Sequence, residues 1–184
     1  MKIIDFFVAK DFSESARLLY AAVVKQARQP EFYVDFGVPD TPDGRFDLIL
    51  VHAFLVLRRL KRDFDKTSEL SQEVFDLMFA DVDQNLREMG IGDMGVGKRI
   101  KAMAEGFYGR VEAYEKGLAE EGTALADALE RNLYRKTSPD PDHSQAVAQY
   151  IRDQARLLDA ADIDGLCAGN LTFGPPPVRQ EAEK

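Results

Sequence analysis

The stretch FDLILVHAFLVLRRLKR, residues 46–62, decides the fold that this sequence predicts. Apolar residues occupy nearly every side of a helix built from it until the basic residues begin at Arg58. Just before it, Thr41 can cap a helix, Pro42 suits a first helical position, and Asp43 favours the positive end of the helix dipole. A helix that is apolar on nearly all sides is normally central and covered by its neighbours.

The segments around this stretch also have helical spacing. Residues 13–29 place apolar side chains three or four positions apart, and Pro30 ends the pattern. Further helices are predicted at residues 68–89, 96–118, 124–135 and 144–161, with a short turn near 163–167. The linker before Thr41 is predicted to be a loop held against the core by Phe32, Tyr33 and Phe36. No strand alternation is evident, so we expect an all-α fold of about six or seven packed helices.

The bulk properties fit one compact domain. The chain has 184 residues and a net charge of −8, which argues against nucleic acid as a direct ligand. Its single cysteine, Cys167, can form no internal disulfide. We find no signal peptide pattern, and we expect a cytoplasmic protein. The domain is predicted to span residues 1–173, followed by a disordered, Pro-rich and charged tail at residues 174–184.

The sequence GDMGVGKR, residues 92–99, has the spacing of a phosphate-binding loop. Such a loop needs a preceding strand, a following helix, and a Ser or Thr after its lysine. Here a helix is predicted before the loop, and Arg99 follows Lys98 in place of the hydroxyl residue. We therefore interpret the glycines as a turn between two helices, with Gly90 as a left-handed cap.

The helix predicted at residues 96–118 carries two neighbouring lines of side chains. One line is large and apolar, and the other consists of glycine and alanine, with Gly106 and Gly109 in mid-helix. A mid-helix glycine costs about 1 kcal/mol relative to alanine, so it usually has a packing or functional reason. The reason is either close approach of a neighbouring helix or an apolar groove for a segment of another molecule. The residues assigned to the groove are Ala102, Met103, Gly106, Phe107, Tyr108, Gly109, Ala113 and Tyr114.

No residue pattern predicts catalysis, a metal site or a cofactor. His52 lies in the apolar helix without a carboxylate or serine one turn away, which favours a core histidine. Neither His52 nor His143 has metal-ligand spacing, and Cys167 is interpreted as a small hydrophobe. Two basic clusters remain as candidates for contact with a membrane surface or a partner, namely Arg58, Arg59 and Arg62, and Lys98, Arg99 and Lys101.

Several stretches together resemble the ubiquinol–cytochrome c chaperone family. They are VPDTPDGRFDL at residues 38–48, the run from LMFADVDQ to YEKGL at 77–118, LADALERNLYR at 125–135, and GNLTF at 169–173. The similarity extends over roughly residues 43–173, and the chain looks like the compact bacterial form, without the presequence of mitochondrial members.

This resemblance implies a helical, non-enzymatic chaperone that binds newly made cytochrome b for assembly of the bc1 complex. It places the protein in the cytoplasm, with peripheral contact at the inner face of the membrane as a further expectation. The alternative for the same apolar groove is a carrier of a hydrophobic small molecule such as a quinone. An enzyme that uses the glycine loop or His52 is a third interpretation, which the residues disfavour, and a purely structural oligomerisation module is a fourth.

Overall fold

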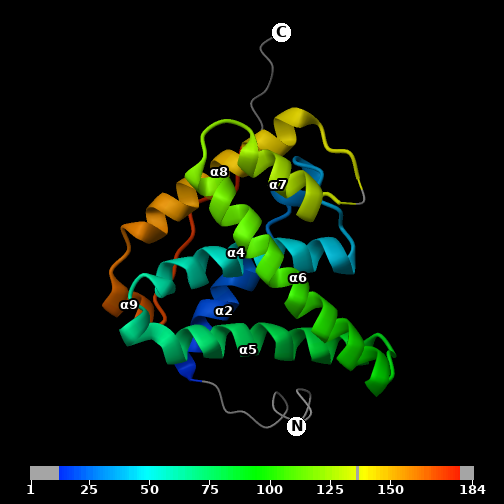
Figure 1. Ribbon diagram of the computed structural model, residues 1–184, viewed down its shortest axis with the longest axis vertical. Coiled ribbons are helices and arrows are strands. Elements are labelled where there is room, and N and C mark those ends of the chain that lie inside the picture. Colours follow the sequence, from blue (N-terminus) through cyan, green and yellow to red (C-terminus); the bar gives the residue numbers. More distant parts are fainter. Residues whose placement is uncertain (1–12, 136, 179–184) are drawn as a thin grey trace.

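The computed structural model describes residues 13–135 and 137–178. Within them, six longer helices are α2 (Glu14–Ala27), α4 (Pro42–Lys61), α5 (Phe64–Glu88), α6 (Asp93–Ala119), α7 (Ala124–Asn132) and α8 (Pro141–Asp159). Two short helices, α3 (Glu31–Val34) and α9 (Ile163–Cys167), lie in the connections (Figure 1). The described residues contain no strand, and the all-α prediction is confirmed.

Helix α4 is the centre of the packing, as its sequence predicted. Every residue from Phe46 to Val56 is buried. Helices α2, α5 and α8 pack directly against it, and α6 crosses the front of the molecule above α4 and α5 (Figure 1). The predicted start is also present, because the Thr41 hydroxyl accepts a hydrogen bond from the Gly44 amide at 3.1 Å, and Pro42 is the first helical residue.

Two polar residues on α4 lie inside this core and are paired there. His52 is fully buried, with Nδ1 donating to the Leu48 carbonyl at 2.9 Å and Nε2 lying 3.0 Å from the Tyr150 hydroxyl of α8. Because a carbonyl only accepts, Nδ1 carries the proton and the Tyr150 hydroxyl donates to Nε2. That hydroxyl also accepts from the Gln26 amide of α2 at 2.8 Å. The histidine therefore joins three helices, and its interpretation as a core residue is confirmed.

Asp47 is the second buried polar residue of α4. Its carboxylate lies 3.1 Å from Arg110 of α6 and 2.8 Å from Arg135, which follows α7. Burial raises the pKa of Asp47 to about 6, although both arginines oppose the shift. This ion-pair group connects α4 to α6 and to the segment that follows α7.

The loops and the chain end differ in part from expectation. The linker before α4 contains the short helix α3, and Phe32 and Phe36 are buried as predicted. We predicted disorder from Gly174, yet Gly174 itself is held, with its amide donating to Gln154 at 2.8 Å and its carbonyl accepting from Gln26 at 2.9 Å. Residues 179–184 of the predicted tail lie outside the described residues.

Asp47 and His52 should make the stability of the fold depend on pH in opposite directions. Burial lowers the pKa of His52 to about 4. Its contribution to the free energy of unfolding is therefore present above about pH 6.5 and is lost as pH falls. The raised pKa of Asp47 means that its contribution is present below about pH 4 and is lost as pH rises through 6. Between pH 5 and pH 7 the two changes oppose each other, each by about 1 to 2 kcal/mol.

Chemical denaturation at pH 5 and pH 7 tests this opposition. Asp47→Asn should make the free energy of unfolding rise more with pH than in the wild type, because only the histidine contribution remains. His52→Gln should reverse the sign of the change. Three parallel profiles would show that neither residue titrates differently in the folded and unfolded chains.

Candidate functional site

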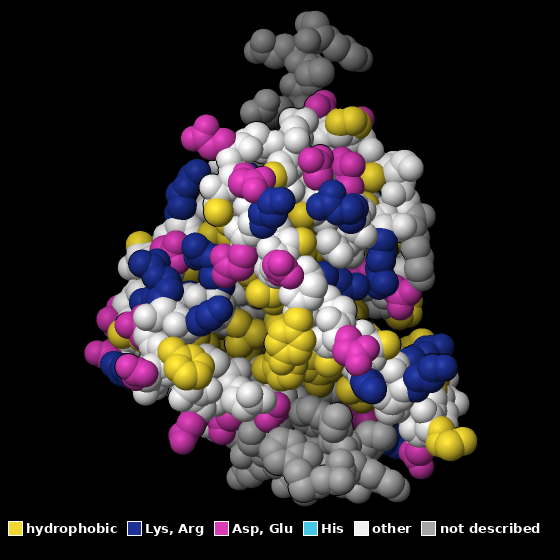
Figure 2. Space-filling view, in the orientation of Figure 1, with side chains coloured by type: hydrophobic (Ala, Val, Ile, Leu, Met, Phe, Trp, Pro, Cys, Tyr) yellow, Lys and Arg dark blue, Asp and Glu magenta, His cyan; other side chains and the backbone are white. Residues whose placement is uncertain are grey.

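An apolar groove of about 650 Å³ lies between α5 and α6. Its apolar lining comes from three helices: Leu57 of α4, Phe64 and Phe75 of α5, and Phe107 and Tyr108 of α6. Figure 2 shows hydrophobic side chains gathered in the hollow below α6. Tyr108 is 65% exposed and Phe64 is 59% exposed, so large aromatic surface faces solvent here. Exposed apolar surface of this kind marks binding sites on soluble proteins.

The aromatic rings of the groove pack as a connected group. Phe75 lies 5.5 Å from Phe107 and 6.1 Å from Tyr108 between ring centroids, and it also contacts Phe79 at 4.8 Å. These distances lie within the range of favourable aromatic pairs. Because the inner rings are anchored in the core, they can hold Tyr108 in place at the mouth of the groove.

The polar rim of the groove is acidic. Ser68, Glu69, Ser71, Gln72 and Glu73 of α5 form this side of the lining. Among the described residues that line the groove, none is a lysine or an arginine. An occupant would thus meet an apolar floor and a carboxylate edge.

The structure divides the predicted groove residues of α6 among three environments. Phe107 and Tyr108 line the groove, and Met103 packs against the core in a half-buried position. Tyr114 is buried, with its ring 5.6 Å from Phe54, so it belongs to the core around α4. Ala102, Gly106 and Gly109 are exposed, Ala113 is half-buried, and none of these four lines the groove.

The small residues lie on a different flank of α6 from Tyr108. At 100° per residue, Gly106 is about 200° around the helix from Tyr108. An added Cβ at Gly106 or Gly109 would meet nothing within 4 Å among the described residues. At Gly117, by contrast, it would lie 2.7 Å from the Cα of Leu125 on α7. Close helix approach therefore explains Gly117, but it explains neither Gly106 nor Gly109.

Sequence reasoning missed Leu57 and Phe64 as groove residues. In the sequence, Phe75 belongs to an apolar stripe that Val74, Met78 and Phe79 also form along this helix. Helical spacing alone could not single out Phe75, because it places this residue within the same apolar stripe as its buried neighbours. Val74 and Phe79 are buried, whereas Phe75, which lies between them around the helix, is only partly buried.

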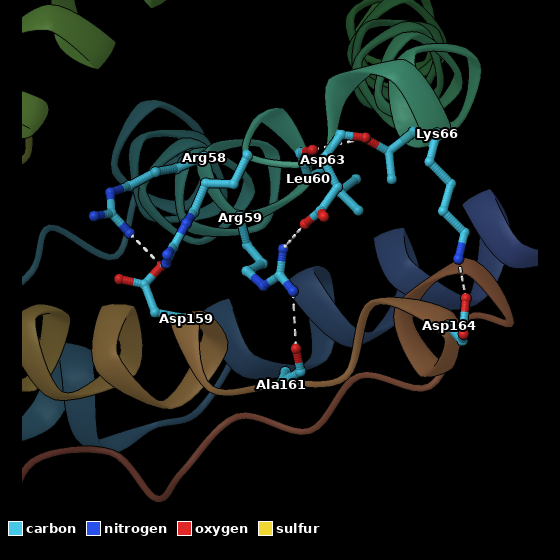
Figure 3. Close-up of polar contacts among 10 residues, drawn as sticks. Arg58, Arg59, Leu60, Asp63, Lys66, Asp159, Ala161 and Asp164 are labelled. Atoms are coloured by element: carbon cyan, nitrogen blue, oxygen red, sulfur yellow. Dashed lines mark hydrogen bonds and ion pairs between the residues drawn. The ribbon is translucent and has the colours of Figure 1, made fainter.

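The first basic cluster, Arg58, Arg59 and Arg62, makes polar contacts within the protein. Figure 3 shows Arg58, Arg59 and Asp63 beside the end of α8. Arg58 and Arg62 each lie 2.8 Å from the Asp159 carboxylate, while Arg59 donates to the Ala161 carbonyl at 2.9 Å. These contacts fasten the C-terminal end of α4 to the turn between α8 and α9.

The second basic cluster remains at the surface. Lys98, Arg99 and Lys101 are exposed near the start of α6, and Met94 beside them is 93% exposed. Lys101 lies 3.8 Å from Glu105, a distance at which surface pairs contribute little.

The glycine-rich stretch is a helix connection. Gly90 has φ +79°, its amide donates to the Arg87 carbonyl at 2.9 Å, and the Ile91 amide donates to Leu86 at 3.1 Å. Those two bonds form the left-handed cap that the sequence predicted. Gly95, Gly97 and Lys98 already belong to α6, so their amides are not arranged as a phosphate-binding loop after a strand.

Comparisons with known proteins agree with this architecture. The family model described as "Ubiquinol-cytochrome C chaperone" matches residues 34–173, which include every helix that lines the groove. The chain belongs to the ubiquinol–cytochrome c chaperone family. The resemblance drawn from its motifs is thereby confirmed, and the family match begins a little earlier than residue 43.

Individual members of this family differ in length. "Ubiquinol-cytochrome-c reductase complex assembly factor 1" of Xenopus laevis is 27% identical over 169 residues, which are 92% of this chain and 84% of the relative. The human assembly factor 1 is also 27% identical, over 88% of this chain but only 54% of its own length. The chain thus spans little more than half of the human relative.

A solved family structure has the same fold. The crystal structure of the Cbp3 homolog from Brucella abortus matches with a TM-score of 0.79 and 40% identity, covering 88% of this chain and 89% of that chain. Across residues 13–135 and 137–178, no helix combines the length and the hydropathy that crossing a membrane requires.

The glycines of α6 provide a stability test of their two environments. Gly106→Ala and Gly109→Ala should each raise the free energy of unfolding by about 0.5 to 1 kcal/mol, because alanine favours the helix and meets no neighbour. Gly117→Ala should lower it, since the methyl group would collide with the Leu125 backbone. Denaturant titration of the three variants measures these changes. Destabilisation by alanine at Gly106 and Gly109 would contradict an open flank.

Proposed function

We propose that this protein is a non-enzymatic chaperone for assembly of the ubiquinol–cytochrome c reductase (bc1) complex. In this proposal it binds newly made cytochrome b through the groove between α5 and α6. Family membership supports the assembly role, because the relatives are named as assembly factors of that reductase complex. The main observation in favour of this site is its aromatic lining around Phe75, Phe107 and Tyr108, which is open to solvent.

The groove suits an apolar segment of a membrane protein. Covering apolar surface stabilises a complex by about 25 cal/mol per Å², whatever the detailed sequence of the segment. A chaperone needs such tolerance, because it must hold a client before the final helix contacts exist. The groove also remains open along α5 and α6, with Phe64 and Tyr108 largely exposed. A carrier site would bury most of a quinone, so an extended client fits better.

The absence of catalytic chemistry at His52 supports a binding function. Both ring nitrogens of His52 are occupied by Leu48 and Tyr150, and the ring is fully buried. Burial also keeps its pKa near 4, so the ring stays neutral at physiological pH. It therefore presents neither a base nor an acid to a substrate.

Photo-crosslinking in the native cell tests the proposed client and its site together. A crosslinker that replaces Tyr108 should capture cytochrome b, whereas one that replaces Val34 should not. Val34 is a suitable control because it is 79% exposed and lies outside the groove lining. Captured partners would be identified by mass spectrometry.

Two outcomes would reject this function. Equal capture at both positions would indicate unspecific contact, and no membrane protein at Tyr108 would remove the proposed site. Added quinone should leave the crosslinking yield unchanged. Quinone binding without any protein capture would instead favour the carrier function.

The surface near the start of α6 is our proposed contact with the cytoplasmic membrane surface. Lys98→Glu with Arg99→Glu should abolish sedimentation with phosphatidylglycerol vesicles, because each basic residue near an anionic surface contributes about 1 kcal/mol. Lys25→Glu with Lys116→Glu changes the net charge equally at exposed positions elsewhere and should have a smaller effect. Equal losses would show that only the total charge matters.

A further inference from the structure

The chain enters the described fold at the rim of the groove. Ser13 caps α2, where its side-chain oxygen accepts a hydrogen bond from the Ala16 amide at 3.3 Å. The same hydroxyl donates to the carboxylate of Glu73 on α5. Glu73 is one of the residues that line the groove. The segment that precedes Ser13 therefore joins the fold beside the apolar surface that we assign to the client.

This preceding segment has the composition of a groove ligand. Residues 1–12 read MKIIDFFVAKDF and lie outside the described residues. They include Ile3, Ile4, Phe6, Phe7, Val8 and Phe12, which give about half of the segment large apolar side chains. Such side chains gain free energy when they leave water for an apolar surface. The exposed rings of Phe64 and Tyr108 provide that surface.

The length of the segment is also compatible with the groove. Twelve residues reach about 40 Å when extended and about 18 Å as a helix. Phe64 and Phe75, which line the groove along α5, are about 16 Å apart at the rise of an α-helix. The segment is thus long enough to follow the groove in either form. Lys2 and Lys10 can pair with the acidic rim formed by Glu69 and Glu73, while Asp5 and Asp11 leave the side chains of the segment without net charge.

We propose that residues 1–12 bind in the α5–α6 groove of their own chain and are displaced when a client arrives. This inference rests on the proposed function of the groove. A short tether gives an intramolecular ligand an effective concentration in the millimolar range, so even weak contacts fill the site. A client must then compete with the segment, and its apparent affinity falls by the fraction of chains in which the groove is free.

Fluorescence can report directly on occupancy of the groove. The chain contains no tryptophan, so Tyr108→Trp introduces a single indole at the groove mouth. In this background, Phe6→Ser with Phe7→Ser should shift the emission to longer wavelength and increase quenching by acrylamide. Val34→Ser is the matched control, since it removes an exposed apolar side chain outside the groove lining and should leave both signals unchanged.

A model ligand then tests competition. The probe is a Leu/Ala peptide of about twenty residues with lysines at both ends, long enough to represent a membrane-spanning segment. Phe6→Ser with Phe7→Ser should bind it several-fold more tightly than the parent, while Val34→Ser should match the parent. Circular dichroism of each variant confirms that the helices are intact.

The outcomes separate the two proposals. If the peptide changes the indole signal but the phenylalanine substitutions do not, the groove binds apolar segments and the self-binding inference is wrong. If the substitutions change the signal but the peptide does not bind, self-binding stands and the client function fails. A signal that depends on protein concentration would show that the segment occupies a second copy, which also contradicts binding within one chain.

Discussion

The rest of the structure depends on the need to cover α4 on all sides. Every residue from Phe46 to Val56 is buried, so no face of this part of the helix can be left to water. Each large side chain buried there contributes about 1.5–3 kcal/mol, which offsets the entropy lost when the surrounding helices are ordered. Helices α2, α5 and α8 pack on α4, and Tyr114 places α6 against Phe54. Polar groups on such a helix must find partners inside the protein, as His52 and Asp47 do.

The groove lies where α5 and α6 carry aromatic side chains that are not fully covered by packing against α4. Phe79 and Phe107 are buried, while Phe75 bridges them to the exposed Tyr108. A rigid core therefore supports the rings at the mouth, and an occupant would not have to order them. The same core holds His52 and Asp47, which are both paired with partners within the fold. What remains accessible is an apolar surface with a charged edge.

Much of this arrangement could be predicted from the sequence because it follows from single-helix patterns. The all-round apolar character of α4, the Thr41–Pro42 start and the Gly90 cap are local properties, and each predicted the observed feature. Predicting the groove would have required knowing which helices lie side by side. Helical spacing along α6 defines the angular positions of Gly106 and Tyr108, but it does not tell which flank another helix covers. The same limit applies to Arg58, whose partner Asp159 is distant in sequence and is brought near only by packing of α4 on α8.

An apolar groove of this kind has little intrinsic selectivity, because hydrophobic contact is tolerant of sequence. Selectivity can then come only from features that penalise weak or wrongly charged ligands. The acidic rim at Glu69 and Glu73 disfavours acidic segments and favours those with basic ends. Basic residues flank membrane-spanning helices on the cytoplasmic side, so this rim would bias binding toward membrane proteins. If residues 1–12 occupy the groove as proposed, they would lower the apparent affinity of every ligand, and together with the acidic rim they would let a tolerant surface serve a restricted set of clients.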